Sequence, residues 1–151
     1  MLPILGIIAG NGDLPYEIAR LYHQKGGKCF VASIDNDTRT WPGNSKSFAI
    51  GEVGGILKYF EESKVENIVI VGAVERPDLK SLKVDVTGSM LIAKIIKKKF
   101  LGDDNLLRTV SDYLESKGFK IISPQEILKL SQNFTTLYEG CENVKTYLNN
   151  L

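Results

Sequence analysis

Three short runs of continuous apolar residues constrain the fold of this chain more than any other feature. They are ILGIIAG (Ile4 to Gly10), KCFVASI (Lys28 to Ile34) and NIVIVGA (Asn67 to Ala73). Runs of this kind, without alternation of apolar and polar residues, are typical of strands that are covered on both faces of a parallel sheet. They therefore predict three buried strands. FKIIS (Phe119 to Ser123) predicts a fourth strand, and SKSFAIG (Ser45 to Gly51) predicts a short fifth strand.

Segments with apolar residues at helical spacing separate these strands. They cover residues 14–25, 53–64, 88–100 and 104–117. The alternation of strands and helices with short connections predicts right-handed strand–helix–strand units and an α/β fold with a doubly wound, mostly parallel sheet. The 151 residues are enough for one compact domain. From Ser131 the sequence becomes polar and rich in Asn, so residues 131–151 are predicted to form a tail or a short docking helix.

Composition and charge argue against a nucleic-acid-binding, a membrane-spanning and a disulfide-rich protein. The formal charge of +1 gives no overall reason to expect nucleic acid as a partner. No apolar run reaches the roughly 18 residues that a membrane span needs, and the N-terminus lacks the charged region of a signal peptide. Cys29 and Cys141 have neither a metal-type spacing nor the pattern of a disulfide framework. These observations predict a soluble, cytoplasmic protein.

The first strand runs into a glycine-rich corner, GNGDLP, that opens the first helix with Asp13 as its expected N-cap. Glycines let a ligand approach the backbone, and the amides at a helix start attract negative charge, so the corner is a candidate phosphate site. Gly10 and Gly12 supply half of a dinucleotide fingerprint, and Asp35 lies about where the ribose-binding acid belongs. Pro15 occupies the position of the third glycine, which argues against a dinucleotide. A tight turn without a ligand is the structural alternative.

Two later motifs extend the candidate site. Gly72 ends the third strand and is followed by Arg76, which could hold a phosphate at the same edge of the sheet or lie in a solvated loop. The second motif is GDDNLLR, in which Asp103 and Asp104 open a helix. Two carboxylates at that place suit Mg²⁺, although an N-cap and a favourable helix dipole explain them equally simply.

The segment IAKIIKKKF (Ile92 to Phe100) places four lysines among apolar residues. It could lie against anionic lipid headgroups, and a solvated helix face is the simpler interpretation. The lone His23 has no Ser or Cys partner in a recognisable arrangement, so the residues by themselves assign no catalytic group and no metal ligand.

Taken in order, the motifs GIIAGNGDLP, IGEVGGILKYFEE, IVIVGAVERPDL and GDDNLLRTVSDYLESKGFKIISPQEIL resemble the N-terminal domain of the LpxI-type UDP-2,3-diacylglucosamine diphosphatases. The likeness runs from about Ile4 to Leu128. It implies a Rossmann-like three-layer sandwich with a mostly parallel sheet of four to five strands, formed by residues 1–130. It also implies a set of substrate-contacting residues, in which Asn11 replaces the usual glycine. They are Gly10, Asn11, Gly12, Leu14, Pro15, Gly72, Arg76, Pro77, Gly102, Asp103 and Asp104.

The resemblance further implies a reaction, the Mg²⁺-dependent hydrolysis of UDP-2,3-diacylglucosamine to UMP and 2,3-diacylglucosamine 1-phosphate in lipid A biosynthesis. It also implies that the reaction takes place in the cytoplasm, at the inner membrane. Nothing in the chain corresponds to the family's second domain, which carries the acidic residues for the metal and for hydrolysis. The chain is therefore expected to bind substrate, to be inactive without a second domain, and to be able to self-associate through an exposed interface. The alternatives are a stand-alone module that binds a nucleotide or phosphosugar, and a remnant without a ligand.

Overall fold

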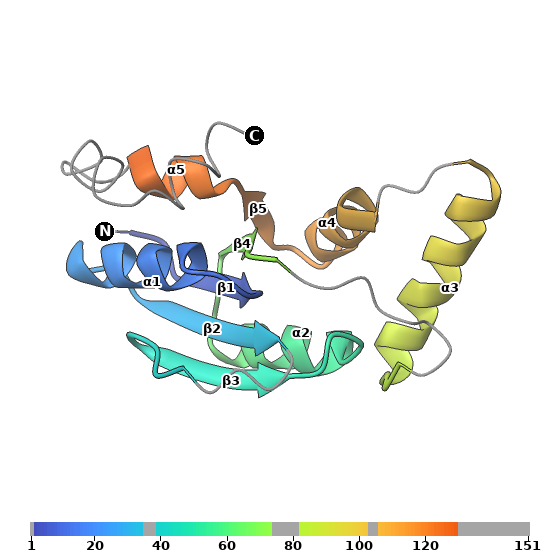
Figure 1. Cartoon of the computed structure of the whole chain (residues 1–151), viewed down its shortest axis with the longest axis horizontal. Helices are drawn as coiled ribbons and strands as arrows, with labels where there is room; N and C mark the ends of the chain where they lie inside the picture. Colours follow the sequence, from blue (N-terminus) through green and yellow to red (C-terminus); the bar gives the residue numbers. More distant parts are fainter. Residues whose placement is uncertain (1, 35–38, 74–81, 103–105, 130–151) are drawn as a thin grey trace.

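The computed structural model describes residues 2–34, 39–73, 82–102 and 106–129 (Figure 1). Strands and helices alternate along most of these residues. In chain order they are β1 (Leu5–Ala9), α1 (Leu14–Gln24), β2 (Cys29–Ile34), β3 (Asn44–Phe48), α2 (Val53–Glu62), β4 (Asn67–Val71), α3 (Val86–Phe100), α4 (Leu106–Ser116), β5 (Lys120–Ile122) and α5 (Pro124–Lys129).

The five strands form one parallel sheet in the order β3-β2-β1-β4-β5. Strand β1 lies at its centre, where Ile7 is paired with Val31 of β2 and with Val69 of β4. The chain moves outward from β1 to β2 and β3, and then returns to the other side of β1 to form β4. Open α/β sheets bind ligands at such a reversal, beyond the carboxyl ends of the strands. The predicted α/β fold with a doubly wound parallel sheet is confirmed.

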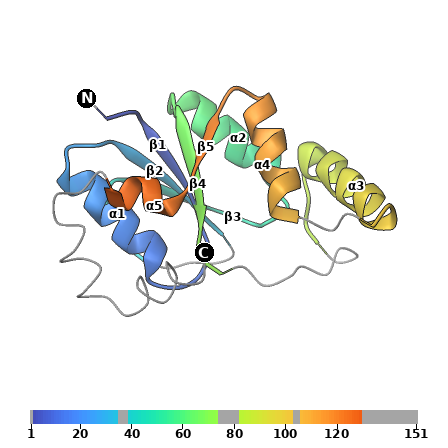
Figure 2. The same cartoon turned by 90° about the horizontal axis from the view of Figure 1, so that it is seen from above.

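Helices cover both faces of the sheet, which makes three layers (Figure 2). Helices α1 and α5 lie on one face, where Ile18 and Ile127 belong to the same buried cluster as Ile7. Helices α2 and α4 lie on the other face, where Phe60 and Leu114 are almost completely buried. Helix α3 packs against α2 and α4, outside the layer that covers the sheet.

The strands and the four longer helices agree in type with the predicted elements, and their ends differ by a few residues. Helix α5 is absent from the predicted elements. Its start carries a capping pattern, because the Glu126 amide donates a hydrogen bond of 3.3 Å to the Ser123 hydroxyl. Ile127 and Leu128 are buried in the cluster shared with α1, so tertiary packing holds this six-residue helix. The predicted tail at 131–151 lies outside the described residues.

None of the described helices has both the length and the apolar character that crossing a bilayer requires.

Candidate functional site

The glycine corner between β1 and α1 is joined by backbone hydrogen bonds to the end of β4. The Gly10 amide donates to the Val71 carbonyl over 2.9 Å, and Asn11 and Ala73 exchange bonds of 2.7 and 3.0 Å. The amides of Gly10 and Asn11 are therefore bound to protein carbonyls and do not point at a ligand. Like the proline at the place of the third glycine of the fingerprint, this geometry argues against a dinucleotide site.

Gly72 is the residue that lets the two strand ends meet. Its φ of +97° is in the region that favours glycine, and a Cβ there would lie 2.8 Å from the Asn11 oxygen, the Gly10 carbonyl carbon and Pro15 Cγ. The close approach brings together residues from two sequence motifs at the carboxyl edge of the sheet. Their role as substrate contacts stays a prediction.

The other side of the corner is open. Gly12 is exposed, has a φ of +103°, and a Cβ built on it would meet no atom within 4 Å. Helix α1 then begins with Asp13 at the N-cap, as predicted, but its side chain makes no capping hydrogen bond. Leu14 and Pro15 are buried, and Pro15 has no amide hydrogen, so Leu14 and Tyr16 supply the amides of the first turn. An anion beside Gly12 would face this helix start.

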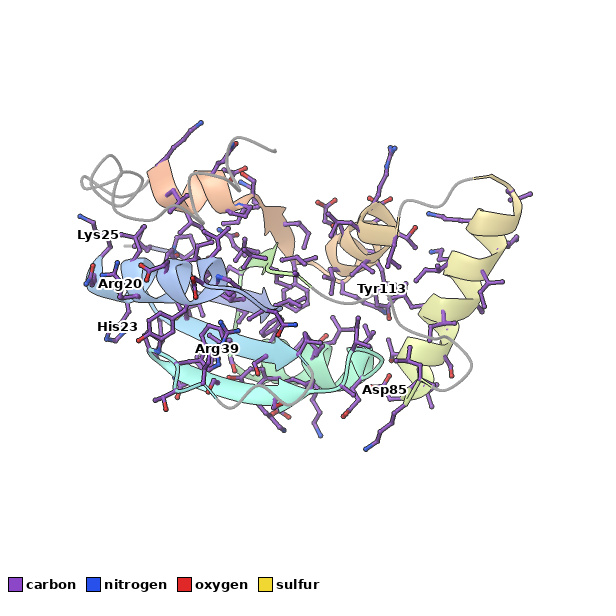
Figure 3. The ribbon with its side chains drawn as sticks, viewed as in Figure 1. Arg20, His23, Lys25, Arg39, Asp85 and Tyr113 are labelled. Carbon is purple, nitrogen blue, oxygen red and sulfur yellow. The ribbon has the colours of Figure 1, made fainter. Side chains whose placement is uncertain are left out.

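Arg39, which belongs to no predicted motif, binds the corner from the segment that precedes β3. Its guanidinium donates to the Gly12 carbonyl over 2.5 Å and to the Gly10 carbonyl over 2.9 Å. The group also lies 4.5 Å from the ring centroid of the buried Trp41. Figure 3 shows Arg39 in the region of α1 and β2. The contacts place a positive charge beside the open space at Gly12, which favours a negatively charged ligand.

A second glycine-rich junction lies at the starts of α2 and α3. Here a carboxylate of the protein, that of Asp85, supplies the negative charge. Asp85 Oδ1 accepts a hydrogen bond from the Gly88 amide over 2.7 Å, and Oδ2 accepts one from the Gly55 amide over 2.9 Å. Partial burial raises the pKa of Asp85, but hydrogen bonds from backbone amides, including that of Gly54, outweigh this effect and hold the pKa below its ordinary value. The carboxylate joins two helices and has a structural role.

The remaining predicted residues divide into two groups. Arg76, Pro77, Asp103 and Asp104 lie outside the described residues. Gly102 follows α3 with a φ of +90° and is exposed. Figures 1 and 2 show α3 apart from the start of α1.

The described residues offer no group of three or more His, Cys, Asp or Glu side chains that could hold a metal ion. The two carboxylates that the sequence suggests for Mg²⁺, Asp103 and Asp104, lie outside the described residues. Burial raises the pKa of Cys29 to about 11, and its Sγ lies 3.7 Å from the Pro42 carbonyl oxygen. Cys29 is buried in the core, its thiol is protonated at neutral pH, and it is therefore a poor nucleophile.

Comparison with known proteins gives two matches. The model of the LpxI N-terminal domain family matches residues 4–130. The UDP-2,3-diacylglucosamine pyrophosphatase LpxI of Caulobacter vibrioides is 33% identical over 129 residues, a match that covers 82% of this chain and 45% of that relative. The chain thus spans about half the length of the curated relative that it matches.

Proposed function

The chain belongs to the LpxI N-terminal domain family, and on this premise we propose that it is the substrate-binding domain of a UDP-2,3-diacylglucosamine pyrophosphatase. The observation that carries the proposal is the family match over residues 4–130. In the proposed reaction water attacks the diphosphate of UDP-2,3-diacylglucosamine and breaks one P–O bond. The products are UMP and 2,3-diacylglucosamine 1-phosphate, a precursor of lipid A.

The diphosphate is proposed to lie beside Gly12, at the start of α1. Three features support this position: the open space at Gly12, the adjacent start of α1, and the Arg39 guanidinium on the neighbouring carbonyls. A helix start and a guanidinium both favour the negative charge of a phosphate. The corner also lies at the reversal of strand order, where α/β sheets commonly bind nucleotides.

We propose that hydrolysis needs a second domain. Breaking a diphosphate requires neutralised charge and an activated water, and this chain matches only 45% of the length of the relative that carries the activity in its name. The metal ligands and the group that activates water would come from that second domain, with Mg²⁺ as the proposed ion. Because the substrate carries two acyl chains, the complete enzyme would work at the cytoplasmic surface of the membrane.

The proposal is tested first by binding. Thermal-shift titrations with UDP, a UDP-sugar and NAD should show stabilisation by the uridine compounds and none by NAD. The Arg39→Ala variant should bind the uridine compounds more weakly. A shift with NAD and none with uridine compounds would contradict the proposal.

A hydrolysis assay tests the division of labour. With Mg²⁺ and UDP-2,3-diacylglucosamine, this chain alone should release no UMP, and adding the C-terminal part of the Caulobacter relative should restore release. Rapid Mg²⁺-dependent turnover by the 151-residue chain alone would refute the need for a second domain. Binding with no restored turnover would instead indicate a module that binds without catalysis.

A further inference from the structure

The exposed large hydrophobic residues of the described chain gather in one segment. They are Val84, Val86, Met90, Ile96 and Leu101 on α3 and beside it, and Leu106 and Leu107 at the start of α4. Val86 is 79% exposed, Leu101 72% and Met90 64%. Domains of this size rarely leave so many apolar side chains together in water unless the surface binds something.

One side of helix α3 packs against α2 and α4, and the other side is exposed. Leu91 is only 4% exposed, and the Asp85 carboxylate ties the helix start to α2. Helix α3 packs outside α2 and α4. Figure 1 shows it at the end of the molecule toward which β1, β2 and β3 point, and it runs across their direction. We define the α3 face as Val86, Met90, Lys94 and Lys97, which share one side of the helix.

Lysines interleave with the apolar residues of this segment. Lys94, Lys97, Lys98 and Lys99 lie within the helix, and no Asp or Glu occurs between Val86 and Gly102. Lys94 and Lys97 are exposed. Val86, Met90 and Lys97 follow a spacing of four and then seven residues, which places them on one stripe of the helix.

This composition favours a lipid surface over a protein. The centres of protein–protein interfaces are depleted in lysine, whereas helices that lie in the membrane interface combine an apolar face with lysines that reach the headgroups. The single sign of charge is complementary to an anionic bilayer.

We propose that the α3 face docks onto the surface of an anionic phospholipid bilayer, with α3 lying in the plane of the headgroups. This docking rests on the proposed function, because the acyl chains of the proposed substrate reside in such a bilayer. The exposure and the charge of α3 are independent of that function. The docking adds a second contact to the corner: one surface holds the nucleotide end of the substrate, and the other holds the membrane.

Vesicle flotation of the 151-residue chain tests the proposal. The chain should float with vesicles of phosphatidylcholine mixed with phosphatidylglycerol, and much less with phosphatidylcholine alone. The double variant Lys94→Gln/Lys97→Gln should bind the anionic vesicles about thirtyfold more weakly, since each lysine near such a surface contributes about 1 kcal/mol. Val86→Ser/Met90→Ser should also weaken binding, because less apolar surface enters the interface.

The matched control is Lys28→Gln/Lys120→Gln. Both lysines are exposed and lie at the amino ends of β2 and β5, so the change in charge is the same at the opposite edge of the sheet. Its vesicle binding should equal that of the unmodified chain. Equal losses in the two lysine variants would overturn the proposal, because binding would then follow net charge alone.

Three further results would also overturn it. One is no flotation with anionic vesicles. Another is a dimer in sedimentation that Val86→Ser/Met90→Ser converts to a monomer, which would assign the face to a second copy. The third is loss of vesicle binding when the C-terminal part of the relative is added. The vesicles contain no uridine compound, and the UDP titration contains no vesicles, so the failure of each proposal is observed separately.

Discussion

The corner at the start of α1 and the junction at the starts of α2 and α3 are both lined with glycines, and a carboxylate of the protein accepts the glycine amides of the junction. At the start of α3, the Asp85 carboxylate accepts the Gly88 amide and also reaches the Gly55 amide of α2. At the start of α1, Asp13 makes no capping hydrogen bond and the space beside Gly12 is open. Because a helix start attracts negative charge, the Asp85 carboxylate satisfies the start of α3, whereas the start of α1 is where we propose that a phosphate binds.

The largest effect is expected at Gly72, on which the open corner depends. Gly72→Ala should lower the free energy of unfolding by about 3 kcal/mol, because the new Cβ meets backbone at 2.8 Å and the φ of +97° strains an alanine. Urea denaturation measures the loss. The control is Gly12→Ala, whose φ of +103° is similar but whose Cβ enters open space, so it should cost about 1 kcal/mol. Equal costs would show that the close contact at Gly72 does not hold the corner.

The filled junction is tested at Asp85. Asp85→Ala should cost about 2 kcal/mol, because it removes the acceptor for amides of two helices. Asp112→Ala, at an exposed carboxylate of α4, should change the free energy of unfolding by less than about 0.5 kcal/mol. UDP binding should survive in both variants. Loss of UDP binding in Asp85→Ala, with the fold intact, would contradict the separation of the two helix starts.

The Asp85 contribution should also depend on pH. Its pKa is lower in the folded protein than the ordinary value of 3.8, so the folded state favours the charged carboxylate. The stabilisation is therefore complete above pH 3.8 and is lost as the pH falls from there through the folded pKa. The difference in unfolding free energy between the unmodified chain and Asp85→Asn, measured by denaturation across this range, should shrink on acidification. A difference that is constant or grows would show that the charge of Asp85 is not what joins the helices.

The smallest effect on stability is expected at Arg39. Arg39→Ala should cost about 1 kcal/mol, because the side chain is near the surface and its bonds to two carbonyls compete with water. Its effect on UDP affinity, measured by calorimetry, should be larger than its effect on stability. Arg39→Lys keeps the charge and loses the two-pronged contact, so it separates attraction by charge from positioning. Unchanged UDP affinity in both variants would remove Arg39 from the proposed site.

The strands were predictable because each is encoded by consecutive residues. ILGIIAG and NIVIVGA are apolar on both sides of the strand, so their burial between two helix layers follows from composition. The neighbourhood of Gly10 and Gly72 was also predictable, since parallel strands end at one edge. Helix α5 was harder to predict because six residues are less than two helical turns, too few to show a periodic apolar pattern. Its start, Ser-Pro-Gln-Glu, does carry a capping pattern.

The sequence by itself therefore determined the fold class, the glycine corner and the family. Only the tertiary structure decided which helix start is closed and which is open. Arg39 reaches Gly10 across 29 residues, and Asp85 reaches Gly55 across 30. No local sequence pattern predicts such pairs. The sequence around an arginine in a loop, or an aspartate before a helix, is the same whether the side chain binds water or a distant backbone group. The sheet brings those segments together, and the resulting contacts separate the structural junction from the candidate site.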